Sequence, residues 1–203
     1  MRDRSAPEAR GSRQTGRLRL DGLIGLPLLL SLALAQTLFL PGHNTALATA
    51  GVQQHQLQAV LDNAKPNFSL SDLEGAQREL KQQAGRVVLV HFFATWCEPC
   101  REELSSLSRL HEQPRNEPLS VLAVNVAEAP VRVRRFLESA PVSFPVLLDA
   151  DRAVTRAWGV SVLPTTFVLD RELVARLLVE GDLDWTRADV LAAIEQVGAL
   201  KPK

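Results

Sequence analysis

The sequence contains only two cysteines among its 203 residues. Secreted domains that depend on disulfides for their stability carry more, and a chain of this length can bury a core without them. The two cysteines, Cys97 and Cys100, are three positions apart, a spacing more typical of redox chemistry than of a structural crosslink. The low count therefore excludes a disulfide scaffold and directs attention to this pair.

The sequence also lacks an excess of either charge, since 23 basic and 23 acidic residues balance. Residues 66–203 are slightly acidic, with 16 basic and 19 acidic residues. A nucleic-acid-binding domain needs a basic surface, so we expect no nucleic-acid partner. The 46% of hydrophobic residues is normal for a globular protein, and the length suits one domain plus an appendage.

Charge is absent from the nineteen residues 22–40, a length close to that of a membrane-spanning helix. Six arginines precede this run, and no Lys or Arg follows it before Lys65. By the positive-inside rule, we expect a cytoplasmic basic N-terminus (1–21), a transmembrane signal anchor (22–40) and export of everything beyond. The chain would then be a single-pass protein of the cell membrane with its catalytic domain on the extracytoplasmic (periplasmic) side.

A cleaved signal peptide is the alternative, and it would leave a soluble periplasmic protein. Small residues at Ala33 and Ala35, at Ala46 and Ala48, and at Ala48 and Ala50 are spaced for cleavage. The hydrophobic run is longer than a usual signal core, which favours retention. Residues 41–65 are interpreted as a linker, with one helical turn at Leu57, Val60 and Leu61, and residues 66–203 as the folded domain.

The folded part begins with alternating strand and helix patterns. Residues 87–94 and 119–126 are apolar runs expected of strands buried on both faces. Between them, Cys100, Leu104, Leu107 and His111 recur at helical spacing. Pro130 suits the start of a second helix and Pro141 its end.

The remaining patterns complete an α/β domain. We expect a short strand at 146–148, a short helix at 151–158, two strands at 166–169 and 173–180 that form an antiparallel pair, and a final helix with Val190, Leu191, Ile194 and Val197 facing inward. This order predicts a mixed sheet flanked by helices.

The Cys97–Cys100 pair follows a predicted strand and opens a predicted helix. A helix N-terminus favours negative charge, so Cys97 is the expected nucleophilic thiolate and Cys100, one turn further on, the resolving thiol. Pro99 lies in the first turn, where a missing N–H costs little. A zinc half-site with His91 and His111 and a purely structural disulfide are the alternatives; both histidines are poorly placed for zinc.

Four blocks resemble, in order and spacing, the TlpA/ResA/CcmG group of membrane-anchored thioredoxin-like oxidoreductases: HFFATWCEPCREEL, VLAVNVAEA, SFPVLLDAD and GVSVLPTTFVLD. The resemblance covers about residues 66–180. It implies a thioredoxin fold with an inserted βα unit, and disulfide reduction outside the cytoplasm without a cofactor. In the ResA branch the substrate is the haem-binding cysteine pair of apocytochrome c.

The resemblance also assigns further site residues. Pro164 matches the cis-proline loop that faces the cysteines, so Leu163, Pro164 and Thr165 are expected to bind substrate together with Trp96 and Pro99. An ordinary trans proline is the alternative. Glu128 matches the buried glutamate of the ResA branch, which could move the proton of Cys100; the alternative is a solvated residue that caps the next helix.

Several functions remain open at this point. The first is reduction of apocytochrome c by a dithiol that a membrane thiol donor of the CcdA/DsbD type recharges. General periplasmic disulfide reduction, reduction of copper-site thiols, an oxidising role and a non-catalytic tethered binding module are the others. Arg101, Glu102 and Glu103 are expected on a solvated helix face, and Trp158 and Trp185 in the core or at its rim.

Overall fold

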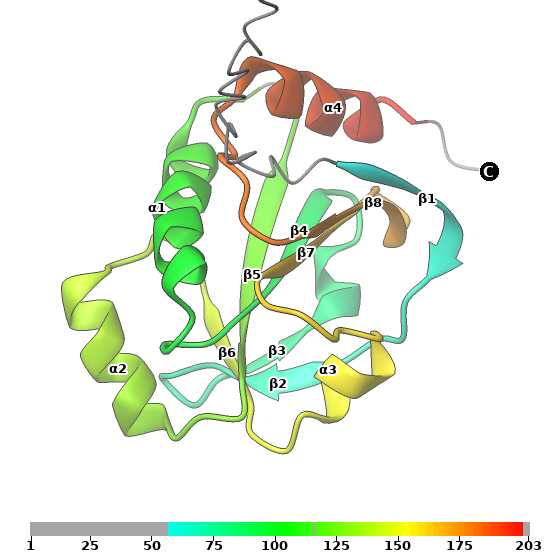
Figure 1. The fold of residues 1–203 in the computed structure, drawn as a ribbon. Coiled ribbons are helices and arrows are strands. Elements are labelled where there is room, and N and C mark those ends of the chain that lie inside the picture. Colours follow the sequence, from blue (N-terminus) through cyan, green and yellow to red (C-terminus); the bar gives the residue numbers. More distant parts are fainter. Residues whose placement is uncertain (1–56, 116, 201–203) are drawn as a thin grey trace, which may run out of the picture. The chain divides into compact units, whose positions relative to one another are not determined.

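A mixed sheet of six strands forms the centre of the domain, in the order β1-β8-β7-β4-β5-β6 (Figure 1). The structure is a computed structural model, and it describes residues 57–115 and 117–200. The predicted segments 1–21 and 22–40 lie outside the described residues. Within the described part of the chain, no helix has the length and apolar character needed to cross a bilayer.

The predicted strands at the centre of the sheet are confirmed. Strands β4 (Val87–Phe93), β5 (Leu119–Val126) and β6 (Val146–Asp149) run parallel to one another. On the other side of β4, β7 (Thr165–Leu169) and β8 (Val174–Glu180) form the expected antiparallel pair. Every residue of β4 is buried, which explains why its sequence is apolar throughout except for one histidine.

Helices cover both faces of the sheet (Figure 1). On one face, α1 (Glu98–Glu112), α2 (Pro130–Ser139) and α4 (Ala188–Gly198) pack over inward side chains of the central strands. On the other face lie α3 (Ala153–Ala157) and the 3₁₀ turn η1 (Leu80–Gln83). Leu104, Leu107 and Leu110 of α1 are buried, and each stabilises the fold by roughly 2 kcal/mol.

The expected linker is wrong over its last residues. Gln58–Ala64 forms β1, an edge strand antiparallel to β8 with an irregularity between Ala59 and Asn63. The three-and-four spacing of Leu57, Val60 and Leu61 suggested a helical turn, but pairing with β8 decides the conformation. The folded domain therefore begins earlier than residue 66.

A small hairpin between β1 and β4 was not predicted. Its strands, β2 (Ser69–Ser71) and β3 (Gln77–Glu79), are only three residues long and too polar to show an apolar pattern. The buried Asp72 organises the turn by accepting hydrogen bonds from the backbone N–H groups of Glu74 and Ala76 and from Arg78.

The topology gathers four connections at one edge of the sheet. The parallel strands β4, β5 and β6 end there, and the antiparallel β7 begins there. The carboxyl edge of parallel strands is where α/β proteins place their sites. Trp96 and Cys97, Glu128, Arg152 and Pro164 all follow or precede strands at this edge.

Candidate active site

Cys97 caps the N-terminus of α1 and forms a disulfide with Cys100 in the first turn of the helix. Their Cα atoms are 5.3 Å apart. The N–H of Cys97 donates to the carbonyl of Ala94, which holds the short connection from β4. Pro99 occupies the first turn, as predicted, where the missing N–H of a proline costs little. After reduction, the unpaired N–H groups and the dipole of α1 favour a thiolate at Cys97 over a thiol.

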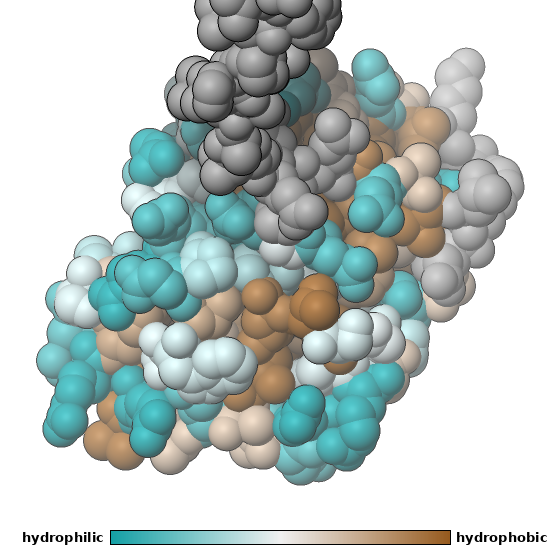
Figure 2. Space-filling model, in the orientation of Figure 1, coloured by the Kyte–Doolittle hydropathy of each residue, from teal (hydrophilic) through white to brown (hydrophobic). Residues whose placement is uncertain are grey.

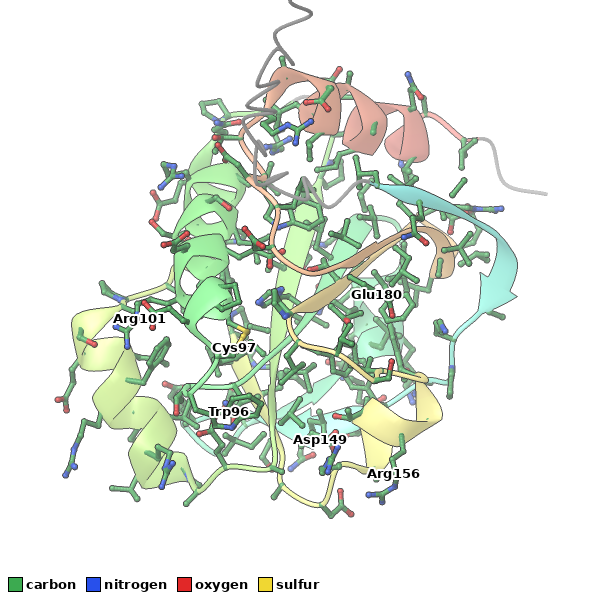
Figure 3. All side chains as sticks on the ribbon, viewed as in Figure 1. Trp96, Cys97, Arg101, Asp149, Arg156 and Glu180 are labelled. Carbon is green, nitrogen blue, oxygen red and sulfur yellow. A yellow bond between two sulfur atoms is a disulfide. The ribbon has the colours of Figure 1, made fainter. Side chains whose placement is uncertain are left out.

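The two sulfur positions differ in access. Cys97 is 6% exposed, whereas Cys100 is fully buried in the core beneath α1. Trp96, the residue before Cys97, is 68% exposed and lies next to Cys97 in Figure 3. A disulfide of another protein can therefore reach Cys97 but not Cys100.

The loop before β7 lies next to the cysteines. The Leu163–Pro164 peptide bond is cis, and Leu163 packs against the core cluster that contains both cysteines. The carbonyl of Pro164 accepts a hydrogen bond from the N–H of Gly181, and the buried Thr165 donates its hydroxyl to the carbonyl of Val162. Among the described residues, the backbone N–H and C=O of Leu163 have no partner, so they can pair with an extended segment.

Glu128 is 9% exposed and bonded to the connection that leads into Cys97. Its carboxylate accepts hydrogen bonds from the N–H and the hydroxyl of Thr95, both at 2.6 Å, and from the side-chain amide of Asn125 at 2.8 Å. It does not cap α2, whose N-cap is Ala129 without a side-chain hydrogen bond. The structure thus ties Glu128 to the residue two positions before the nucleophile.

Sequence reasoning placed Glu103 on a solvated face, and that expectation is wrong. Glu103 is 2% exposed, and its Oε1 accepts hydrogen bonds from the indole N–H of Trp185 at 2.6 Å and from the hydroxyl of Thr166 at 3.2 Å. The spacing offered a signal, because Glu103 lies three residues after Cys100 and four before Leu107, on the inward side of the helix. Trp158 and Trp185 are both core residues.

His91 in the middle of β4 completes this buried polar cluster. Its Nδ1 lies 2.9 Å from the hydroxyl of Thr166 and 3.8 Å from Oε1 of Glu103. Burial raises the pKa of Glu103 to about 8, and it lowers the pKa of His91 to about 3. At neutral pH the cluster therefore holds a protonated carboxyl and a neutral imidazole, and it adds no charge beneath α1.

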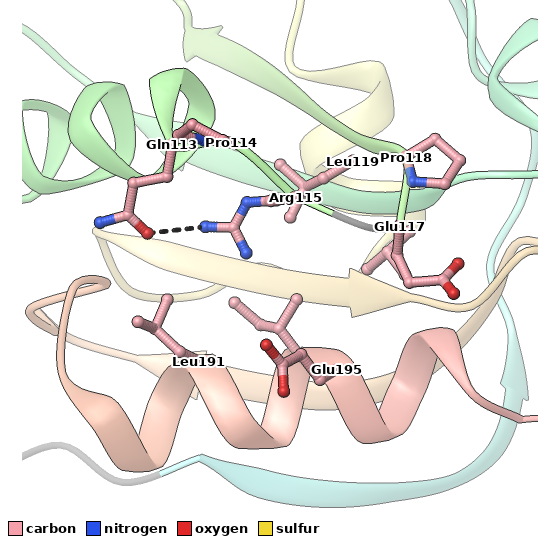
Figure 4. A pocket seen from close by; sticks show the side chains of 10 residues that line it. Gln113, Pro114, Arg115, Glu117, Pro118, Leu119, Leu191 and Glu195 are labelled. Carbon is pink, nitrogen blue, oxygen red and sulfur yellow. Dashed lines mark hydrogen bonds between the residues drawn. The ribbon is translucent and has the colours of Figure 1, made fainter.

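Two hollows of the described surface bear on the site. The larger, of about 520 Å³, lies between the end of α1 and α4 and is lined by the first residues of β4 and β5 (Figure 4). It is therefore at the opposite end of the sheet from the cysteines. The smaller, of about 350 Å³, is lined by Leu163 and by Trp96, the residue before Cys97.

Comparisons with known proteins agree with this geometry. The AhpC/TSA family profile matches residues 61–177. The thiol-disulfide oxidoreductase ResA of Geobacillus thermodenitrificans is 34% identical over 132 residues, which cover 65% of this chain and 75% of the relative. ResA of Bacillus subtilis is 41% identical over 107 residues, covering 53% of this chain and 60% of the relative, so the match spans less than two thirds of that protein.

Solved structures show the same fold. A protein described as a thiol:disulfide interchange protein DsbE from Chlorobium tepidum has a TM-score of 0.59 at 28% identity, covering 69% of this chain and 96% of that one. A secreted thiol-disulfide isomerase from Corynebacterium glutamicum has a TM-score of 0.61 at 24% identity, covering 70% and 90%, and it supports the fold alone. The chain belongs to the AhpC/TSA family and is a thioredoxin-like thiol–disulfide oxidoreductase of the ResA/DsbE type.

Proposed function

We propose that the chain reduces disulfides of exported proteins, with the cysteine pair of apocytochrome c as its main substrate. The observation that carries the proposal is the pairing of Cys97, which is slightly exposed at a helix N-terminus, with a fully buried Cys100. The choice of substrate is supported by the similarity to thiol-disulfide oxidoreductases named ResA, because the family resemblance implies the haem-binding cysteines as substrate. The same geometry serves a general reductase or a copper-site reductase, so the test must identify the partner.

The proposed reaction transfers two electrons in two exchange steps. The thiolate of Cys97 attacks one sulfur of the substrate disulfide, forming a mixed disulfide and releasing the other substrate sulfur as a thiolate. Cys100, once deprotonated, attacks the sulfur of Cys97 and releases the second substrate thiolate. The substrate disulfide is reduced and Cys97–Cys100 is oxidised; a membrane thiol donor of the CcdA/DsbD type then restores the dithiol.

We propose Glu128 as the group that receives the proton of Cys100 in the resolving step. In support, Glu128 is largely buried and bonded to Thr95, directly before the site. Trp96, Pro99, Leu163, Pro164 and Thr165 are proposed to bind the substrate segment around its disulfide.

Replacing Glu128 with Gln should raise the rate of Cys97 alkylation at pH 7 by about two- to threefold, because a negative charge no longer opposes the thiolate. Reduction of a protein disulfide should nevertheless slow, since the proton acceptor is lost. Glu138→Gln on the exposed side of α2 is the matched control and should change neither rate. Superimposable alkylation profiles of wild type and Glu128→Gln from pH 5 to 9 would exclude this role.

Substrate and compartment can be tested together. We propose that residues 22–40 anchor the chain and that residues 66–203 face the extracytoplasmic side. The Cys100→Ser variant should accumulate mixed disulfides through Cys97 in the membrane fraction, and mass spectrometry should identify apocytochrome c as a partner. Protease added to intact spheroplasts should digest the domain.

The outcomes separate the parts of this proposal. If the trapped partners are copper-site proteins or a wide range of exported proteins, and not apocytochrome c, the proposed substrate is wrong but the proposed chemistry stands. Partners that are only cytoplasmic, together with protection from protease, would overturn the orientation. A soluble mature chain would overturn the anchor alone.

A further inference from the structure

Trp96, the residue before Cys97, lines a groove that Thr155 of α3 also lines. We call it the Trp96 groove; its volume is about 350 Å³, and it is bounded by side chains from the connections after β4, β5 and β6 and from the loop before β7. Its lining includes Trp96, Ala127, Arg152, Val162 and Leu163. Because Leu163 lines the groove and packs against the core cluster that contains both cysteines, a substrate segment paired with Leu163 would pass along the groove.

Part of the lining of the Trp96 groove is apolar and open to solvent. Trp96 is 68% exposed and Val162 is 46% exposed, two of the few large hydrophobic side chains that the described surface leaves in water. Figure 2 shows hydrophobic surface near the middle of the same face. Exposed apolar side chains next to a reactive cysteine favour contact with an apolar residue of a partner.

Two other residues that line the groove have an uncommon backbone conformation. Arg152 (φ 62°) and Ala127 (φ 59°) are both in the left-handed region, which side chains other than glycine avoid. The N–H groups of both residues donate to the carbonyl of Asp149, each at 3.1 Å. The carboxylate of the buried Asp149 accepts from the N–H and hydroxyl of Thr155, so this wall is fixed from beneath. A costly conformation that its surroundings enforce is a mark of functional sites.

The guanidinium of Arg152 has no hydrogen bond or ion pair among the described residues. Nearby arginines differ: Arg156 donates to the carbonyl of Asp151, and Arg101 lies 4.8 Å from the ring of Phe136 (Figure 3). The positive charge of Arg152 is therefore available at a groove that Trp96 and Val162 also line.

We propose that Arg152 determines substrate specificity by binding a carboxylate of the substrate segment that lies in the Trp96 groove. The occupant is an extended segment of a substrate protein that carries an apolar side chain and an acidic side chain close to its disulfide. The apolar side chain contacts Trp96 and Val162, and the acidic one pairs with Arg152. This inference rests on the proposed function, because it requires that the substrate disulfide meets Cys97.

Disulfide-bonded peptides test the proposal. Four peptides share an internal Cys-x-x-Cys disulfide and one adjacent Leu, and they differ by Glu or Gln on the N-terminal or C-terminal side. The measurement is the second-order rate constant of their reduction by the pre-reduced protein. We expect wild type to prefer Glu over Gln on one side by roughly fivefold at low salt, and the preference to shrink in 0.5 M salt.

Variants at Arg152 decide the outcome, because the ratio of two rates on the same protein is insensitive to losses of active material. Arg152→Asn tolerates the left-handed backbone and should lower the Glu-to-Gln ratio to about one, whereas Arg152→Lys should keep part of it. Arg156→Gln, the matched control on α3, should keep the wild-type ratio. Equal rates for Glu and Gln peptides with wild type, or an unchanged ratio in Arg152→Asn, would overturn the proposal. Failure of wild type to reduce any peptide would instead overturn the proposed function, and this inference with it.

Discussion

Replacing Cys97 with Ser should abolish protein disulfide reduction, lowering the rate by roughly 10³-fold or more, because a serine hydroxyl cannot supply a thiolate near neutral pH. Cys100→Ser should retain the first step and stop at the mixed disulfide. The two variants therefore fail differently although each removes a single sulfur. Stopped-flow reduction of a peptide disulfide, combined with non-reducing gels, distinguishes the two results.

The physical reason lies in the different surroundings of the two sulfurs. Cys97 caps α1 and is the partly exposed one, whereas Cys100 is fully buried one turn further along. In the reduced protein, iodoacetamide should therefore modify Cys97 at least about tenfold faster than Cys100. Equal alkylation rates, or a Cys97→Ser variant that still reduces the peptide, would contradict the assignment of the nucleophile.

The sequence predicts the elements whose pattern is local. Strands β4 and β5 are apolar runs, and α1 shows a helical spacing that begins at the cysteines, so their bounds follow from the residues themselves. Edge strand β1 is different, because Gln58–Ala64 owes its conformation to β8, more than a hundred residues away in the chain. Its own sequence carries no strand pattern.

Burial of a polar residue is equally difficult to predict. Glu103 is buried because Thr166 and Trp185, 63 and 82 residues away, donate hydrogen bonds to its carboxyl group. The left-handed backbone at Arg152 is likewise fixed by contacts of Asp149. The positions of the cysteines and of Pro164 could be predicted from short motifs, but the groove and the buried cluster depend on contacts between distant segments.

We expect the oxidised wild type to lose stability as the pH rises above 6.5. The Glu103→Gln substitution should abolish this loss. Burial raises the pKa of Glu103 to about 8, whereas the unfolded carboxyl titrates near 4.5. Between these values the native state holds a proton that the unfolded chain has lost, so stability falls as pH rises. Burial lowers the pKa of His91 to about 3, so between about pH 3 and 6.5 the unfolded chain holds a proton on His91 that the native state lacks. In that range the His91 effect makes stability rise with pH.

The two effects cancel between about pH 4.5 and 6.5, where we expect a plateau of stability. Above pH 6.5 only the Glu103 effect remains, and the free energy of unfolding should fall by about 2 kcal/mol between pH 6.5 and 9. The disulfide keeps both cysteines from titrating in this range. Urea unfolding of the oxidised protein at a series of pH values measures the profile.

Gln at position 103 keeps an acceptor for Trp185 and Thr166 but has no proton to lose, so the Glu103→Gln profile should stay flat from pH 6.5 to 9. Glu102→Gln, one position away on the exposed side of α1, should retain the wild-type decline. A decline of the same size in Glu103→Gln would mean that a group other than Glu103 keeps a proton in the native state and loses it on unfolding. Because burial away from water is the main cause of the raised pKa of Glu103, the decline should also persist in 0.5 M salt, unlike the effect of a surface charge.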